Sequence, residues 1–271
     1  MGAGEDARGG LSRPDASGPA GPLHYHGRVG STAAPRIAAF LTAVATAIVI
    51  VALAILPFLS PPWVSFEQGR AQADLWTGFT PGELNDATGE ILSDLVFGPP
   101  SFDVEVRGQL VLNEREQAHM RDVRGVFAGF AVLAIVAAAG LVVAYAGARR
   151  LGHPERWWRA VRAGALGTIV GVVVGGVIVF FAFDAAFEVF HRLFFAGGTY
   201  LFDPATDRLV QLFPFKFWDE TTMAVGAVIV AISLLVAFVA GRRARRAAAV
   251  TTPGEPAPPQ SVARHGSEPA S

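Results

Sequence analysis

The chain has 271 residues, of which 52% are hydrophobic and only 17% are charged, and its formal net charge is −1. Soluble domains carry about 25% charged residues, so this composition argues against an ordinary soluble enzyme. The sequence contains no cysteine, which excludes a disulfide framework, a cysteine nucleophile and a thiolate metal site. The net charge near zero argues against a nucleic-acid-binding protein.

Four blocks of apolar residues follow one another along the chain. Each is close to the length of about 20 residues that crosses a hydrocarbon core as a helix, and none has a charged residue near its centre. The blocks also lack the alternation of period two that marks the strands of a membrane barrel. We therefore predict an all-α integral membrane protein, a bundle of four spanning helices at about residues 37–59, 125–148, 164–187 and 223–240.

The third block is rich in glycine, at Gly164, Gly167, Gly171, Gly175 and Gly176. Small residues four positions apart open a groove in which a second helix can approach closely. Since a chain with four spans has its own helices to pack, internal packing is favoured over dimerisation.

The distribution of arginine predicts the topology. The link between the second and third blocks carries five arginines against one acid, and a run of arginines follows the fourth block. The segment 60–124 instead has five basic and eleven acidic residues, and the segment 188–220 has three and five. The positive-inside rule places the arginines in the cytoplasm and the loops 60–124 and 188–222 outside.

This topology divides the chain into three parts. Residues 36–242 form the membrane domain, and residues 1–35 and 243–271 are cytoplasmic tails that we expect to be disordered because they are rich in Gly, Pro, Ala and Ser. The first apolar block is too long for a signal peptide and is typical of a signal anchor. The nearly exclusive use of arginine among the basic residues, with Lys216 the only lysine, and the heavy use of alanine and glycine suggest a GC-rich bacterial genome. We therefore expect the protein in a bacterial cell membrane.

The outer loop 60–124 is long enough for a small head. Thr80 followed by Pro81 and Glu83 has the pattern of a helix N-terminus, and apolar residues then recur at helical spacing. We predict an amphipathic helix over about 81–96 that lies on the membrane or on the bundle. Alternation over 102–107, with a turn at Gly108, predicts short strands.

Asn113 and Glu116 form a second capping pattern, which starts a helix that runs through His119 into the second span. The connection after the third span is unusually aromatic, and such a segment can settle at the lipid interface. An ordinary aromatic belt is the simpler interpretation, although it does not explain the polar residues among the rings.

Two histidines converge in this topology. His119 precedes the second span and His191 follows the third, so both lie at the outer membrane surface, whereas His153 lies in the cytoplasmic link. A carboxylate beside an imidazole fixes its tautomer and raises its basicity, as a general base requires. The carboxylates at helical spacing from the two histidines are Glu116, Asp122, Asp184 and Glu188.

Two other interpretations of these polar residues stay open. They can be interfacial groups that cap the bundle, and spacing alone favours this interpretation over a catalytic site. They can also ligate a metal, but zinc needs three or four ligands, and no HExxH or HxH pattern occurs outside the N-terminal tail with His24 and His26. We therefore expect no metal and no organic cofactor.

Several sequence strings resemble one family of four-span membrane proteins. They are EQAHMRDVR at 116–124, FHRLFF at 190–195, GTYLFDP at 198–204, DRLV at 207–210 and FP at 213–214. The chain resembles the bacterial family that includes the lipoprotein intramolecular transacylases, called Lit, over about residues 36–242.

The resemblance implies an acyltransferase that moves the sn-2 acyl chain of a diacylglyceryl-cysteine to the α-amino group of the same cysteine. Its partners are then membrane lipids and a diacylated lipoprotein, and the motif histidines His119 and His191 are its catalytic residues. Because ester and amine belong to one substrate, proximity supplies much of the rate. Groups that can hold the developing oxyanion or position the substrate are Arg124, Arg192, Gly197, Gly198, Tyr200 and Asp207.

A non-catalytic membrane protein, whose acidic head binds an envelope partner, is the alternative hypothesis. The distance between the histidines discriminates the two. Imidazoles within about 8 Å of each other around a lipid-sized crevice suit two acid–base groups that bridge a substrate. Imidazoles on opposite sides of the bundle favour the binding protein.

Overall fold

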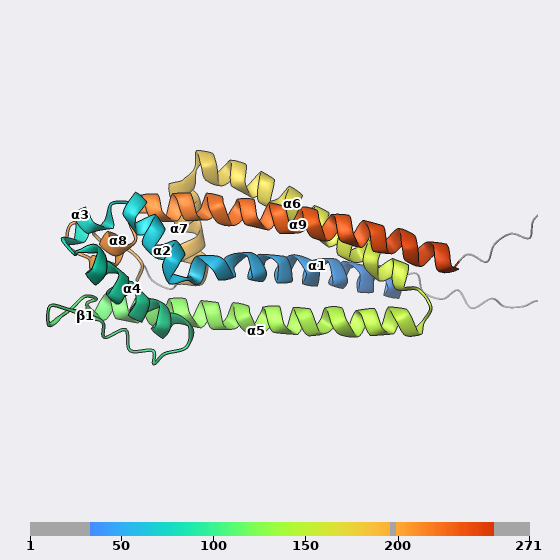
Figure 1. Cartoon of the computed structure of the whole chain (residues 1–271), viewed down its shortest axis with the longest axis horizontal. Coiled ribbons are helices and arrows are strands. Elements are labelled where there is room, and N and C mark those ends of the chain that lie inside the picture. Colours follow the sequence, from blue (N-terminus) through green and yellow to red (C-terminus); the bar gives the residue numbers. More distant parts are fainter. Residues whose placement is uncertain (1–32, 196–198, 252–271) are drawn as a thin grey trace, which may run out of the picture.

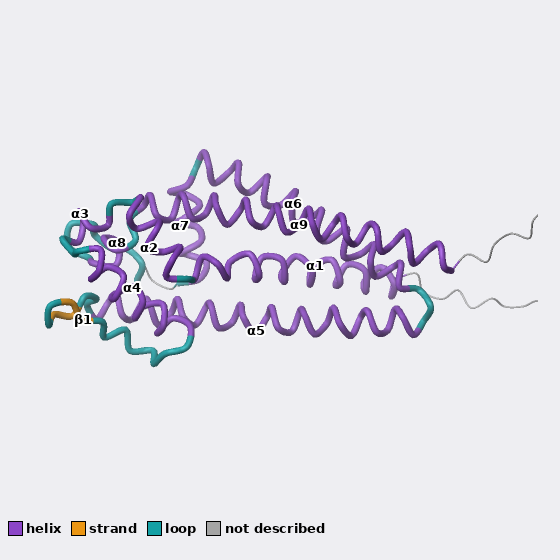
Figure 2. The backbone as a smooth tube through the Cα atoms, viewed as in Figure 1, coloured by secondary structure: helices purple, strands orange, loops and turns teal. Residues whose placement is uncertain are grey.

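The computed structural model describes residues 33–195 and 199–251, and helices dominate this part of the chain (Figure 1). Strands occur there only in one small hairpin, as Figure 2 shows. The elements in chain order are α1 (Ala33–Ile55), a 3-10 turn (Leu56–Leu59), α2 (Pro61–Arg70), α3 (Ala73–Thr77), α4 (Pro81–Val96), β1 (Glu105–Val106), β2 (Gln109–Leu110), α5 (Glu114–Arg150), α6 (Pro154–Phe181), α7 (Phe183–Phe194), α8 (Arg208–Leu212) and α9 (Phe215–Thr251).

Four of the described helices, α1, α5, α6 and α9, are long and apolar enough to cross a membrane. They form an elongated bundle in which α6 packs along α9 and α1 lies against both α5 and α6. The head, made of α2, α3, α4, the hairpin and α8, covers one end, and both ends of the described chain lie at the other (Figure 1). The prediction of an all-α integral membrane protein with four spans and a small head is confirmed.

The third span ends earlier than its predicted limit at residue 187. α6 stops at Phe181, and the backbone of Ala182 leaves helical geometry with φ −143° and ψ 47° before α7 begins. Asp184 then lies in the first turn of α7, where the helix dipole favours a negative charge. The break turns the chain, so that α7 runs across the bundle axis instead of prolonging α6 (Figure 1).

The fourth span continues beyond the predicted end of the membrane domain at residue 242. α9 reaches Thr251, so residues 243–251 are helical, although the composition predicted a disordered tail from 243 onward. This stretch consists largely of alanine and arginine. Both residue types have high intrinsic helix propensity, so they prolong the preceding helix at little cost.

The glycines of α6 divide into two groups. A Cβ atom on Gly164 would overlap the backbone of Ala43, so this glycine lets α1 and α6 cross in close contact. Gly167, Gly171 and Gly175 have no such neighbour within 4 Å among the described residues. Internal packing thus explains only the first glycine of the predicted groove.

The head contains the predicted amphipathic helix, because α4 spans Pro81–Val96. At its start the Thr80 hydroxyl accepts the N–H of Glu83, and the Glu83 carboxylate accepts the N–H of Thr80 at 2.8 Å. Its apolar face is buried in the core of the head through Leu84, Ala87, Ile91 and Leu95. Of the two predicted places, the membrane and the bundle, α4 therefore takes the second, since this core includes Met120 of α5.

The predicted strands are present but shorter than expected. Only Glu105–Val106 and Gln109–Leu110 pair, antiparallel, across a two-residue turn. Both turn residues, Arg107 and Gly108, have positive φ, as the favoured hairpin turns require. Arg107 also donates two hydrogen bonds of 2.6 Å to Glu83, which ties the hairpin to α4 and, with the Thr80 N–H, lowers the pKa of Glu83 to about 2.

A buried polar cluster, which no sequence motif indicated, joins α2 to the rest of the head. Gln68 donates to the Thr88 hydroxyl and to the Leu212 carbonyl, both at 3.0 Å. Its neighbour Glu67 is 1% exposed, and its Oε1 has no hydrogen-bond partner among the described residues. Burial and the nearby Glu220 carboxylate raise the pKa of Glu67 to about 7.

The raised pKa predicts that Glu67 makes the stability depend on pH. The neutral carboxyl is favoured in the folded state, so its contribution is present below about pH 4.5 and is lost as the pH rises through about 7. Glu67→Gln should therefore raise the thermal midpoint at pH 8, by the equivalent of about 1–3 kcal/mol, and change it little at pH 5. Thermal denaturation of the purified protein measures this.

The exposed α4 residue Glu90 provides the matched control, because Glu90→Gln removes the same charge without a buried site. An equal shift of the Glu67→Gln midpoint at pH 5 and pH 8 would contradict the role given to Glu67.

Candidate functional site

The two predicted histidines lie together at the head end of the bundle. His119 is on α5 and His191 is on α7, and their ring centroids are 6.1 Å apart with the ring planes inclined by 20°. This separation is within the 8 Å that suits two acid–base groups acting on one substrate. The distance expected of two acid–base groups is therefore met.

The beginning of α5 positions His119. The Asn113 side chain accepts the N–H groups of Arg115 and Glu116, while the Glu116 carboxylate accepts the N–H of Asn113. This capping box starts the helix at Glu114, so His119 lies in its second turn on a buried face with Glu116. His119 is 6% exposed, and its Nδ1 makes no hydrogen bond to a described residue.

A main-chain carbonyl positions His191. Its Nδ1 lies 2.8 Å from the carbonyl oxygen of Phe187, one turn earlier in α7. A carbonyl only accepts, so Nδ1 must carry the proton, and Nε2 is left with a free electron pair. Burial lowers the pKa of His191 below its ordinary value, although the bond to Phe187 opposes the shift. His191 is therefore predominantly neutral at pH 7, with a basic Nε2.

Aromatic rings enclose the histidine pair. The ring centroids of Phe195 and Phe202 lie 4.8 and 5.4 Å from that of His119. Those of Phe187 and Tyr200 lie 3.9 and 5.0 Å from that of His191. These rings limit the access of water, which strengthens electrostatic interactions with a bound substrate.

An ion pair holds the segment after α7 over the histidines. Arg115 donates to the Asp207 carboxylate at 2.6 Å and to the Leu201 carbonyl at 3.2 Å. Its guanidinium carbon also lies 4.9 Å from the centre of the Phe202 ring. Since Phe202 contacts His119, the position of Arg115 determines how closely the segment covers the site.

Two buried carboxylates complete this connection. Asp207 accepts the N–H of Asp203 at 2.7 Å and the amide of Asn113 at 3.3 Å. Glu116 accepts the N–H of Leu209 at 2.6 Å. Both carboxylates thus bind main-chain groups of the loop, which is a different task from the imidazole orientation predicted for Glu116 and the substrate positioning predicted for Asp207.

The other predicted carboxylates are exposed. Glu188 pairs with Arg192 across one turn of α7 at 3.4 Å, and both side chains are largely exposed. Asp184 and Asp122 are also exposed, the first in α7 and the second one turn after His119 in α5. The predicted stripe of Asp184, Glu188 and His191 does not orient the imidazole. His191 bonds to the backbone of its own helix, and Glu188 pairs with Arg192.

Of the groups predicted to hold the oxyanion or position the substrate, Tyr200 lies at the histidines and Arg124 binds elsewhere. Arg124 donates to the Asp94 and Gly98 carbonyls and anchors the end of α4. Tyr200 lies against His191, as described above. Gly197 and Gly198 lie outside the described residues, as do His24 and His26 of the tail.

Within residues 33–195 and 199–251, no group of three or more His, Asp or Glu side chains is placed to hold a metal ion. The histidine pair supplies two of the three or four ligands that zinc uses. The described side chains of this site can transfer protons and can donate and accept hydrogen bonds.

Fold and site together define a class: polytopic membrane proteins with two adjacent histidines in an aromatic enclosure at one end of a four-helix core. The family model of the lipoprotein intramolecular transacylase Lit matches residues 37–218. The chain therefore belongs to the Lit family.

Solved structures of the membrane integral lipoprotein intramolecular transacylase Lit from Bacillus cereus share the fold. One is 16% identical, covers 80% of this chain and 98% of that chain, and has a TM-score of 0.66. Two more, in which a histidine is replaced by arginine or by alanine, are 17% identical, cover 80% of this chain and 95% or 96% of those chains, and have TM-scores of 0.67. No match is found among curated proteins.

The contacts of Arg115 predict a testable role in closing the site. In Arg115→Ala the segment 199–209 should exchange its amide hydrogens faster, and His119 should react with diethyl pyrocarbonate about tenfold faster, because the charge-assisted contact is lost. In Arg115→Lys both rates should lie between those of the wild type and those of Arg115→Ala. Hydrogen exchange and mass spectrometry of the modified peptide measure both effects.

Arg121→Ala is the matched control, since Arg121 is exposed on the same helix and makes one contact of 3.5 Å to the Ser101 carbonyl. Equal modification rates of His119 in Arg115→Ala and Arg121→Ala would show that Arg115 does not close the site.

Proposed function

We propose that this protein transfers the sn-2 acyl chain of a lipoprotein's diacylglyceryl-cysteine to the α-amino group of the same cysteine. The observation that carries the proposal is the pair of neighbouring imidazoles in an aromatic enclosure, at the end of a membrane bundle of the Lit family. Ester and amine of one substrate lie a few bonds apart. A site that holds both against two imidazoles converts their reaction into an intramolecular one.

The transfer needs no water and no second substrate. The neutral amine attacks the ester carbonyl, the N–C bond forms, and a tetrahedral intermediate carries the negative charge on the former carbonyl oxygen. The amine then loses a proton, the C–O bond to glycerol breaks, and the glyceryl oxygen takes up a proton. One proton leaves nitrogen and one arrives at oxygen, so a single base that returns its proton balances the step.

His191 is our choice for that base. Its Nδ1–H is bound to the Phe187 carbonyl, which leaves Nε2 as the free acceptor. Its lowered pKa keeps the ring neutral at pH 7, ready to take the amine proton and to return it to the leaving glyceryl oxygen.

His119 then has the complementary role. A neutral imidazole has one N–H, and from a ring 6.1 Å away this donor can hydrogen-bond the ester carbonyl and stabilise the oxyanion. Tyr200, which lies against His191, borders the same space and is placed to position the substrate.

The surroundings of His191 suit a lipid ester. Helix α7 is strongly amphipathic, with the polar residues Asp184, Glu188 and Arg192 on one face and phenylalanines on another. Such a helix lies in the plane of the membrane interface. The ester groups of a diacylglyceryl chain are at this depth, between the acyl tails and water.

The charges give the orientation that we propose. The end of the bundle opposite the head carries the arginines that link α5 to α6 and those that end α9. The positive-inside rule places this end, and with it both termini, in the cytoplasm. The head and the histidines then face outward, on the side where mature lipoproteins are anchored.

Mass spectrometry tests the proposal. The chain is expressed in a bacterial host whose lipoproteins keep a free α-amino group, and their N-terminal peptides are fragmented. One acyl chain should move from glycerol to nitrogen at unchanged total mass. His119→Ala and His191→Ala should lower the conversion by about 10²–10⁴-fold, because each removes an acid–base group from the transition state.

Two further variants sharpen the assignment. His153→Ala, at the opposite end of the bundle, should convert lipoproteins like the wild type. His119→Gln keeps an N–H donor and should retain more activity than His119→Ala. A free N-terminus despite well-inserted wild-type protein, or normal conversion by both alanine variants, would overturn the proposed function.

A further inference from the structure

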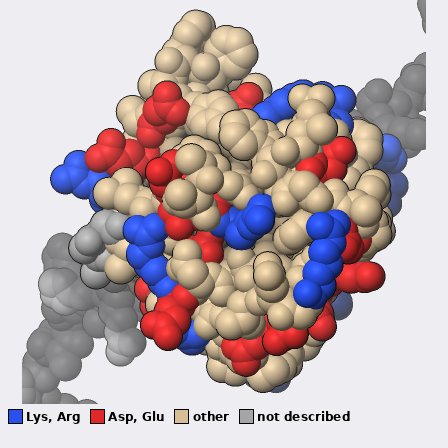
Figure 3. Space-filling view, turned by 90° about the vertical axis from the view of Figure 1, so that its left-hand side faces the viewer, with Lys and Arg blue, Asp and Glu red and all other residues tan. Residues whose placement is uncertain are grey.

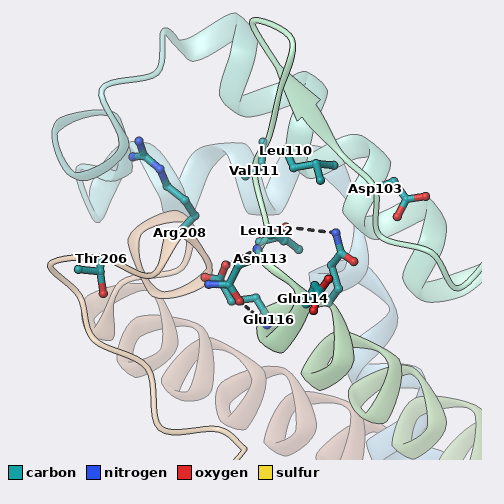
Figure 4. Close-up of a pocket in the computed structure, with 10 residues that line it drawn as sticks. Asp103, Leu110, Val111, Leu112, Asn113, Glu114, Glu116, Thr206 and Arg208 are labelled. Carbon is teal, nitrogen blue, oxygen red and sulfur yellow. Dashed lines mark hydrogen bonds between the residues drawn. The ribbon is translucent and has the colours of Figure 1, made fainter.

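The head contains an open hollow of about 610 Å³ that the proposed chemistry does not use (Figure 4). It lies between the hairpin, the beginning of α5 and the segment around α8, and its size is within the range of ligand-binding pockets, about 300–1,000 Å³. Its wall includes Asp103, Leu110, Asn113, Glu114, Gln117 and Arg208.

The hollow and the histidine site are neighbours along α5. Glu116 lines the hollow, and His119 follows on the same buried face one turn later. A helix rises about 1.5 Å per residue, so the distance along α5 from Asn113 to His119 is about 9 Å. An extended peptide covers about 3.3 Å per residue, so three residues bridge this distance.

The wall offers the groups that a polypeptide needs. Leu110 is 58% exposed and supplies an apolar contact. Gln117 brings an amide oxygen, since only its Nε2 is bound, to the Leu112 carbonyl. The chain between Leu110 and Asn113 adds its own backbone to the wall (Figure 4). Backbone and amide groups recognise a peptide through its main chain, with little demand on its sequence.

The charges of the hollow select between possible occupants. Two exposed carboxylates, Asp103 and Glu114, line it together with one guanidinium, Arg208, whereas the Glu116 carboxylate in its wall is buried. Arg208 already donates to the Thr77 carbonyl and to Gln211. On the surrounding head surface, acidic and basic side chains are interspersed (Figure 3). An excess of negative charge repels a phospholipid phosphate and favours a neutral or basic peptide.

We propose that this hollow binds the polypeptide chain of the lipoprotein, from about the third to the sixth residue after the acylated cysteine, and prefers neutral or basic residues there. The inference rests on the proposed function and adds a specificity site to it. The histidines hold the lipidated end of the substrate, and the hollow holds the chain where it leaves the membrane.

A series of synthetic substrates tests the inference on the purified full-length protein. Diacylglyceryl-cysteine carries one, three, six or nine neutral residues, and kcat and KM are measured for N-acylation. KM should fall about tenfold between one and six residues and stay constant beyond six, with little change in kcat, because the hollow binds substrate and transition state alike. An equal KM at all four lengths would overturn the inference while leaving the proposed function intact.

Charge reversal gives a second measurement. Of two six-residue substrates, the one with lysines at positions three to five should have a KM about three- to tenfold lower than the one with glutamates. The double variant Asp103→Lys and Glu114→Lys should reverse this preference. The double variant Asp86→Lys and Glu90→Lys, at two exposed residues of α4 that do not line the hollow, makes the same change of charge on the head and should keep the preference for lysine.

An unchanged preference in the double variant would also overturn the inference. If no substrate of any length is N-acylated, the proposed function fails and the inference fails with it, a result distinct from conversion that ignores the peptide.

Discussion

Two buried carboxylates, Glu116 and Asp207, hold the segment after α7 against the beginning of α5, and the histidine site depends on this contact. Each accepts main-chain N–H groups, and Asp207 also binds Arg115. Hydrogen bonds to a charged group are worth more than neutral ones, and a partner left alone in a buried place is costly. Polar contacts within the head thus hold the site together. Between the membrane-spanning helices the hydrophobic effect contributes little, because lipid tails are as apolar as the side chains that face them.

In the proposed mechanism, the surroundings of the two imidazoles give them separate roles. His191 bonds to the Phe187 carbonyl and keeps a basic Nε2, whereas His119 is buried among Phe195, Phe202 and the second imidazole. One ring therefore suits proton transfer and the other a hydrogen bond to the ester. This division follows from the tautomer that a main-chain carbonyl imposes, without a carboxylate partner.

Periodicity and capping patterns predicted most of the fold. Local rules were sufficient for the features that depend on neighbours in the sequence. These features are the four apolar blocks, the capping boxes Thr80–Glu83 and Asn113–Glu116 and the apolar stripe of α4. The topology also predicted that His119 and His191 share one end of the bundle. The break at Ala182 and the main-chain partner of His191 were missed, because a chain turn and a backbone acceptor have no side-chain pattern. The buried Glu67 was missed since its partners come from distant helices.

An isotope crossover experiment tests the central claim, transfer within one substrate molecule at the histidine pair. Two lipopeptides are mixed, one with a deuterated sn-2 acyl chain and the other with a ¹³C-labelled peptide. The account predicts that deuterated acyl chains appear only on the nitrogen of unlabelled peptides, and that the product is lost in His119→Ala and His191→Ala. Deuterated chains distributed equally over both peptides would contradict it, because the acyl group would then have left its own substrate before reaching the amine.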